Sequence, residues 1–350
     1  MQVLIHNGKP GLPDQITPDR KFGPMNDTPL VCVIILNWND MPNTIRSIES
    51  INKQGYSNKK VIILDNGSIS DDIKCITSIY PHVDLIFSKT NLGFAGGNNF
   101  AIENALHYEP RFIWLFNNDA VAPEDTLGKL VNFARNIGRF GLISPAIYNM
   151  GEQSSLQALV GVYNLSVPRH DWITDFDAYN KIPDNTNISL VGTALFINMD
   201  LVRSVGYFDN NFFAYWEDVD YSIRSNNAGF KNYLVEDAIV FHPRKSLTDG
   251  IYEIKPHFFY FMTRNELLLW KKFCRRITYF RGALWLFKTN LSLIIRMKLY
   301  KNGRDAIVDG LCDGLLGLGG PHISPPKSRT MIKYLISRYA EKILYIVNRI

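Results

Sequence analysis

Cysteine is scarce in this sequence of 350 residues, and the four cysteines are scattered along it. They are Cys32, Cys75, Cys274 and Cys312. No two are spaced as CxxC, and Cys32 lies inside an apolar run. This scatter argues against a disulfide framework and against a zinc knuckle. We therefore expect a protein of a reducing compartment, the cytoplasm.

Long hydrophobic runs are also missing. No stretch has the roughly 18 consecutive apolar residues that would span a bilayer, so we expect no integral membrane protein. Residues 1–29 are rich in Gly, Pro, Asn and Asp and hold no continuous apolar stretch, which predicts a flexible tail rather than a secretory signal. With 46% hydrophobic residues, the remaining chain can bury a large core.

Acidic residues are absent from one basic stretch. Residues 271–304 contain ten Lys or Arg and no Asp or Glu, although the net charge of the chain is only +5. Four polar or basic residues fall within one arc of a helix there, beside Trp285: Arg281, Lys288, Ser292 and Arg296. The interleaved apolar side chains favour an amphipathic helix on an anionic membrane surface over a nucleic-acid site. A core helix packed on the main domain is the alternative.

Short β-branched runs alternate with helical stretches from Leu30 onward. Strands are predicted at 31–37, 61–66, 83–89 and 112–116, and helices at 41–51, 71–80 and 94–108. Continuous apolar strands separated by helices predict an α/β fold, with a mostly parallel sheet and helices on both faces. In such sheets ligands bind beyond the carboxyl ends of the strands. Four polar residues are expected at that rim: Asn37, Asp65, Asn91 and Asp119.

The later part of the chain divides into three stretches. Residues 152–187 are polar and irregular, which predicts a long loop that is functional or mobile and contacts the acceptor of the reaction. A helix is predicted at 218–226, and the chain reads as helical from about residue 252. We therefore expect a tail at 1–29, an α/β domain at 30–250 and a C-terminal helical region at 251–350.

Two acids open the helix that follows the aromatic run FFAYW. Glu217 and Asp218 are favoured in a first turn by the helix dipole alone. Adjacent acids behind aromatic side chains are also how a general base is kept partly desolvated, with a raised pKa. His242 ends the next strand, and it can complete a metal site with Asp119.

Six stretches in order carry a family resemblance: VCVIILNWND, VIILDNGSISD, TNLGFAGGNN, WLFNNDAV, GTALF and FFAYWEDVDYSIRSNNAGF. Together they resemble the family 2 glycosyltransferases of the GT-A fold, in particular the rhamnosyltransferase-like group of bacterial polysaccharide biosynthesis. The resemblance covers residues 30–244 closely and Arg264-Asn265 more weakly. Each motif is weak alone, but six in order are specific.

The resemblance implies a nucleotide site for a pyrimidine diphosphate sugar. Trp38 would stack on the base and Asp65 would accept a hydrogen bond from the ring N–H. The other residues implied to line the nucleotide are Asn37, Asn66, Asn91, Gly93, Gly96, Gly97 and Asn118.

The resemblance also implies a metal and a base. Asp119 would hold Mg²⁺ or Mn²⁺ against the donor diphosphate, helped by His242. Asn117 departs from the family pattern, where an acid is common, so the chain supplies one carboxylate fewer. Asp218 would deprotonate the acceptor hydroxyl, positioned by Glu217 and Arg224, in a single displacement that inverts the anomeric configuration.

The expected function is therefore an inverting transferase that is peripheral on the inner face of the cytoplasmic membrane. It would move L-rhamnose from dTDP-rhamnose to a lipid-linked glycan acceptor of O-antigen or capsule. UDP-galactofuranose, another UDP-hexose donor, or a catalytically dead glycan-binding homologue are the alternatives. A nicotinamide-dependent oxidoreductase would need GxGxxG after the first strand, where the chain reads LNWNDM.

Overall fold

The chain forms two compact units. The computed structural model describes residues 28–70, 72–151, 155–243, 254–296, 300–322 and 342. The first unit comprises Met1–Gly161, Trp172–Phe208 and Tyr221–Pro243, and the second comprises Val162–Asp171, Asp209–Asp220 and Arg244–Ile350. The tail predicted at 1–29 lies, up to residue 27, outside the described residues, and so does the boundary predicted near residue 250.

An eight-stranded sheet forms the centre of the first unit, with the strand order β11-β5-β10-β4-β1-β2-β3 and β6 paired to β5. Its strands are β1 (Val31–Asn37), β2 (Lys59–Asn66), β3 (Asp84–Ser88), β4 (Phe112–Asn117), β5 (Leu142–Asn149), β6 (Leu156–Ala158), β10 (Phe196–Asn198) and β11 (Tyr233–His242). Only β10 and β6 run antiparallel to their neighbours. The mostly parallel α/β sheet expected from the sequence is confirmed.

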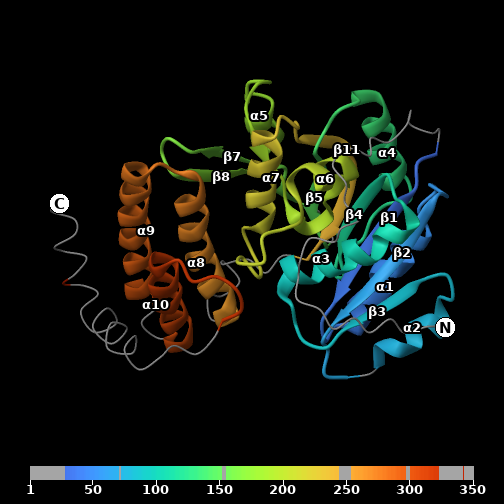
Figure 1. The fold of residues 1–350 in the computed structure, drawn as a ribbon, viewed down its shortest axis with the longest axis horizontal. Helices are drawn as coiled ribbons and strands as arrows, with labels where there is room; N and C mark the ends of the chain where they lie inside the picture. The colour runs from blue at the N-terminus through green and yellow to red at the C-terminus, as the bar shows by residue number, and fades with distance from the viewer. Residues whose placement is uncertain are drawn as a thin grey trace. The chain divides into compact units, whose positions relative to one another are not determined.

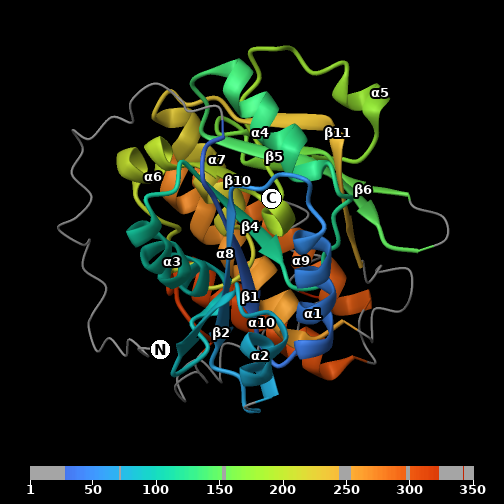
Figure 2. The same ribbon diagram turned by 90° about the vertical axis from the view of Figure 1, so that its right-hand side faces the viewer.

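Helices cover both faces of this sheet. They are α1 (Met41–Asn52), α2 (Ile76–Ile79), α3 (Gly93–Ala105), α4 (Thr126–Ile137), α6 (Met199–Val205) and α7 (Glu217–Asn227), with 3₁₀ turns at Asp72–Cys75, Leu106–Tyr108 and Gly192–Ala194. Figure 2 shows α1 and α3 on opposite sides of β1. Alternation along β1 produces this arrangement, because Val33 packs in the core under α1 while Ile34 packs in the core under α3.

The register of the parallel strands places polar residues together. Asn37, the last residue of β1, pairs with Asp65 of β2, and Leu36 pairs with Asn117 of β4. The three strands therefore end at one rim of the sheet, as expected for an α/β ligand site.

The prediction of an irregular loop over residues 152–187 is wrong. The described part of this segment contains β6, β7 (Val160–Asn164), β8 (Arg169–Ile173) and α5 (Phe176–Tyr179), and β7 lies between β8 and β9 (Ile188–Ser189) in a small sheet. The hairpin was hidden in the sequence because β8, RHDWI, is largely exposed and carries no apolar run.

The C-terminal helical region is confirmed for the described residues. Helices α8 (Pro256–Phe273), α9 (Arg276–Arg296) and α10 (Lys301–Leu316) lie side by side (Figure 1). None of the helices in the described ranges has the length and apolar character that crossing a membrane requires. Glycines allow α8 and α10 to approach closely, because a Cβ on Gly310 would lie 2.6 Å from the Tyr260 carbonyl oxygen.

Gly310→Ala is expected to destabilise the protein by ~1–3 kcal/mol, since the added methyl must push α8 and α10 apart. Gly128→Ala is the matched control, because a Cβ at that position in α4 meets no atom within 4 Å. We expect the control to stabilise by ~0.5–1 kcal/mol. Chemical denaturation of both variants tests this, and equal effects would contradict the close contact.

Candidate active site at the sheet rim

A buried hydrogen-bond cluster joins the ends of β1 and β2. The Asn37 side-chain amide donates to Asp65 Oδ1 at 2.9 Å, and the Ser68 hydroxyl donates to the same oxygen at 2.5 Å. Thr44 of α1 donates to Asn37 Oδ1 at 2.8 Å. Asn37 and Asp65 are 1% and 5% exposed. Because each group is held by its neighbours, the Asp65 carboxylate is pre-positioned to accept a further hydrogen bond from a ligand.

A second cluster fixes the turn between β3 and α3. Asn66 donates its amide to the Gly93 carbonyl at 3.0 Å and accepts from the Leu92 N–H at 3.0 Å. Asn91 Oδ1 accepts from the Gly93 N–H at 2.8 Å. Gly97 has no room for a side chain, because a Cβ would lie 2.4 Å from the Leu36 side chain. The predicted residues Asn66, Asn91, Gly93 and Gly97 therefore share one structural unit at the start of α3.

Three more residues are predicted to line the nucleotide: Trp38, Gly96 and Asn118. Trp38 directly follows β1 and is 47% exposed, so its ring is available to a base. Gly96 lies in the first turn of α3. The Asn118 side chain follows β4 and donates to Thr44 Oγ1 at 3.2 Å, which links it to the Asn37 cluster.

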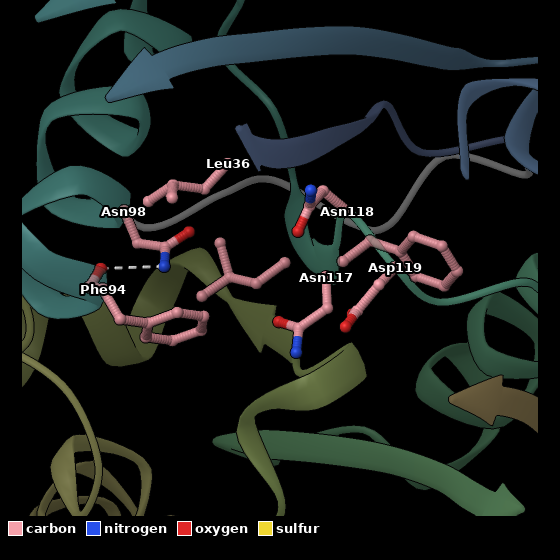
Figure 3. Close-up of a pocket in the computed structure, with 8 residues that line it drawn as sticks. Leu36, Phe94, Asn98, Asn117, Asn118 and Asp119 are labelled. Atoms are coloured by element: carbon pink, nitrogen blue, oxygen red, sulfur yellow. Dashed lines mark hydrogen bonds between the residues drawn. The ribbon is translucent and has the colours of Figure 1, made fainter. Parts of the chain in front are cut away.

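A cavity of about 150 Å³ lies at the end of β4. Figure 3 shows the side chains of Asn117, Asn118 and Asp119 on one side of it and those of Phe94 and Asn98 of α3 on the other. The dashed line is the hydrogen bond that the Asn98 amide donates to the Phe94 carbonyl at 2.9 Å. Ligand pockets for drug-sized molecules typically measure ~300–1,000 Å³, so this cavity accommodates only part of a ligand.

Asp119 and His242 form a pair beside this cavity. His242 Nε2 lies 3.2 Å from Asp119 Oδ1, and the Asn117 amide nitrogen lies 3.4 Å from the same ring nitrogen. On the other side of the ring, His242 Nδ1 lies 3.1 Å from Gln157 Oε1. An amide oxygen only accepts, so Nδ1 donates to Gln157, and the other ring nitrogen, Nε2, faces Asp119.

This pair fits two ligands of a divalent cation. A lone pair and a carboxylate oxygen 3.2 Å apart repel each other unless a proton or a cation lies between them. Adjacent ligands of an octahedral ion with ~2.1 Å bonds are ~3 Å apart, close to this spacing. Within the described residues no group of three or more His, Cys, Asp or Glu side chains is arranged to hold a metal. A bound molecule or water can supply further ligands.

Glu217 and Asp218 begin α7 and belong to the second unit, together with Asp220. Glu217 is 5% exposed, and its Oε2 has no hydrogen-bond partner among the described residues. Burial raises the pKa of Glu217 well above its usual 4.5, and the charges of Asp218 and Asp220 raise it further. Burial and the two neighbouring charges therefore favour the protonated form of Glu217, next to an acid that is only partly buried.

Arg224, predicted to position the base, lies later on α7 and belongs to the first unit. Its guanidinium donates to the Val205 carbonyl at 2.9 Å and the Tyr207 carbonyl at 2.8 Å, and it lies over the Tyr221 ring. These contacts fix the chain after α6, and a role toward the acceptor stays a prediction.

Sequence reasoning missed three residues of the site. Ser68 holds Asp65, Thr44 holds Asn37, and Gln157 accepts a hydrogen bond from His242 Nδ1. Ser68 could have been identified from the sequence, because it lies in the stretch VIILDNGSISD three residues after Asp65. Gln157 had no local signal, since it lies 85 positions from His242.

Residues 32–202 match the family model described as glycosyl transferase family 2. The chain is 24% identical over 243 residues to the N-acetylglucosaminyl-diphospho-decaprenol L-rhamnosyltransferase of Mycobacterium tuberculosis. This match covers 63% of this chain and 78% of the relative. It is 31% identical over 108 residues to an uncharacterized glycosyltransferase of Haemophilus influenzae, over 30% of this chain and 42% of the relative.

Solved structures support the same fold. TarS residues 1–349 of S. aureus, in complex with UDP-GlcNAc, are similar with a TM-score of 0.54 and 13% identity, over 89% of this chain and 87% of that chain. The mannosyltransferase PcManGT from Pyrobaculum calidifontis, in complex with GDP-Man and Mn²⁺, is similar with a TM-score of 0.50 and 14% identity, over 95% and 85%. These likenesses confirm the GT-A fold expected from the sequence.

The buried Glu217 predicts a pH-dependent stability. Its pKa is raised in the folded state, so its contribution is fully present below pH 4.5 and is lost as the pH rises toward the raised value. Glu217→Gln cannot ionise, so its melting temperature should exceed that of the wild type by an amount that grows from pH 4.5 to 8. Glu124→Gln, at an exposed carboxyl, is the control. A difference that does not change with pH would mean that Glu217 is charged in the folded protein.

Proposed function

We propose that this chain is an inverting, metal-dependent glycosyltransferase that uses a nucleotide diphosphate sugar, in keeping with its match to the family 2 model over residues 32–202. The observation that carries the proposal is the rim of the sheet, where one unit holds both the Asn37-Asp65-Ser68 cluster and the Asp119-His242 pair. The first suits a nucleobase and the second suits the cation of a diphosphate.

Donor binding follows from the chemistry of these side chains. The Asp65 carboxylate can only accept while ionised, so it selects a base with a ring N–H, as pyrimidine nucleotides of thymine or uracil have. The exposed Trp38 ring provides a stacking face. Asp119 and His242 would hold Mg²⁺ or Mn²⁺, which when bound neutralises charge on the diphosphate leaving group.

The acceptor is activated by Asp218. Its carboxylate takes the proton of the acceptor hydroxyl as that oxygen bonds to the anomeric carbon and the bond from that carbon to the diphosphate oxygen breaks. The raised pKa of Glu217 favours its protonated form, which would avoid a second full charge next to the base and leave a proton for a hydrogen bond. One displacement of this kind inverts the anomeric configuration.

The donor and acceptor are proposed from the relative in Mycobacterium tuberculosis, an L-rhamnosyltransferase acting on N-acetylglucosaminyl-diphospho-decaprenol. By analogy, this chain would move L-rhamnose from dTDP-rhamnose to a lipid-linked glycan of a bacterial surface polysaccharide such as O-antigen or capsule. UDP-galactofuranose and UDP-hexoses are the rival donors.

Nucleotide diphosphate release from a panel of dTDP, UDP and GDP sugars, with and without Mn²⁺, tests this proposal. We expect one donor to turn over with metal and Asp218→Asn to slow it by more than ~100-fold, the size expected for a general base. Asp177→Asn, an exposed acid in the first turn of α5, is the matched control and should keep wild-type activity.

Three outcomes would contradict the proposal. Full activity in Asp218→Asn would remove the assigned base, and a donor cleaved equally well with EDTA as with Mn²⁺ would remove the metal. If no donor is cleaved and none shifts the melting temperature, the transferase assignment fails as a whole.

Helix α9 supports a peripheral position on the inner face of the cytoplasmic membrane. Four large apolar residues are exposed on it at helical spacing: Ile277 (71%), Phe280 (67%), Leu284 (40%) and Trp285 (56%). The basic residues Arg276 and Arg281 are exposed beside them. Exposed apolar groups flanked by cations suit the boundary between acyl chains and anionic headgroups, where a lipid-linked acceptor also lies.

Co-sedimentation with vesicles containing phosphatidylglycerol tests this surface. Arg281→Gln with Lys288→Gln should weaken binding by ~30-fold, since each charge near the surface contributes ~1 kcal/mol. Phe280→Ser with Trp285→Ser should weaken binding to the same vesicles, and Ile69→Ser, at a residue 95% exposed in the first unit, should not. Unchanged sedimentation of both double variants would show that α9 does not contact lipid.

A further inference from the structure

The loop before Glu217 has a backbone shape that its residues disfavour. Phe213, Tyr215 and Trp216 have φ angles of 61°, 67° and 71°, in the left-handed region. Side chains with a Cβ rarely occupy that region, and bulky aromatic residues do so least readily. Three such residues among four positions need an external constraint, and strain of this kind is concentrated at functional sites.

Two fully buried residues of α8 supply contacts to the loop. Asn265 donates its side-chain amide to the carbonyls of Phe212, Ala214 and Tyr215 at 2.7, 2.8 and 2.8 Å. Arg264 donates through Nη2 to the carbonyls of Asn211 and Phe212 at 3.0 and 2.9 Å.

The two side chains also fix each other. Arg264 Nε donates to Asn265 Oδ1 at 2.8 Å. A guanidinium has only donors, so the Asn265 oxygen must face it and the Asn265 amide must face the loop. Arg264 and Asn265 are both 0% exposed, which strengthens these bonds and makes any lost partner costly.

The constrained loop is bonded directly to the first turn of α7. The Trp216 carbonyl, one residue after the last carbonyl held by Asn265, accepts from the Asp220 N–H at 2.9 Å and so closes the first helical turn. Lys272, also on α8, lies 2.6 Å from Asp220 Oδ1 and 2.8 Å from Asp209 Oδ2. Helix α8 therefore contacts the segment both before and after Glu217 and Asp218.

We propose that Arg264 and Asn265 are positioning residues that hold loop 211–216 in its left-handed shape and thereby orient the Glu217-Asp218 pair for acceptor activation. This inference rests on the proposed function, in which Asp218 is the base. The alternative is that aromatic packing alone shapes the loop, since Trp216 lies between the rings of His170 and Trp270 at 5.3 and 6.4 Å.

Asn265→Asp tests the proposal, because it keeps the side-chain shape and replaces the amide that donates to three carbonyls with an oxygen that repels them. We expect kcat to fall by ~100-fold, the cost of a small misplacement of catalytic groups, while the donor Kd stays unchanged. The matched control is Asn290→Asp, where the amide donates to the Leu286 carbonyl within α9 and has no bond to the loop. It should keep the wild-type kcat.

Two further measurements separate positioning from general stability. A glycine at position 215, in Tyr215→Gly, adopts a positive φ freely. In that background Asn265→Asp should therefore lower kcat clearly less than it does in the wild type. Hydrogen exchange of residues 211–218 should be faster in Asn265→Asp and unchanged in Asn290→Asp. Arg264→Lys, which keeps the charge and loses the forked contacts, should give the same pattern if Asn265→Asp does not fold.

Equal hydrogen exchange of the loop in the wild type and in Asn265→Asp would overturn the proposal. Fully additive effects of Asn265→Asp and Tyr215→Gly on kcat would also overturn it. Faster exchange with an unchanged kcat would also overturn it, because the loop would then have no bearing on the base. If the wild type cleaves no nucleotide sugar, the proposed function fails, and the exchange measurement alone decides whether α8 holds the loop.

Discussion

The parallel pairing of β1 with β2 and β4 is the constraint on which the donor side of the site depends. The register sets Asn37 beside Asp65 and ends β4 at Asn117, so the polar residues after each strand share one rim. Buried apolar side chains on both faces lock that register, because a shift by one residue would turn every core side chain of β1 to the opposite face. The position of the polar cluster is thus a consequence of core packing.

The buried polar groups at the rim stabilise one arrangement because they satisfy each other. Asp65 Oδ1 receives two hydrogen bonds, and Asn66 uses its oxygen and its nitrogen on the turn before α3. Glu217 is the contrast, since one of its oxygens has no partner in the described part of the chain. Satisfied groups rigidify a site, whereas an unsatisfied acid responds to protonation and to ligands.

Much of the fold and part of the site could be predicted from the sequence. Apolar runs and helical periods located the first four strands and the rim residues Asn37, Asp65 and Asp119, because both signals are local. The β7-β8 hairpin could not be predicted, since its exposed residues show no apolar periodicity. The shape of loop 211–216 also escaped: Phe, Tyr and Trp give no signal for a left-handed backbone, which here depends on contacts from α8, about 50 residues away.

The pair of protein ligands at Asp119 and His242 has a kinetic consequence under the proposed function. A cation with only two protein contacts is held mainly when a diphosphate shares its coordination, so its occupancy follows that of the nucleotide. Such an enzyme would take up the ion with the donor and release it with the product nucleotide. Its turnover would then track the concentration of free divalent ion in the cell, and Asn117 in place of an acid would extend that dependence to higher ion concentrations.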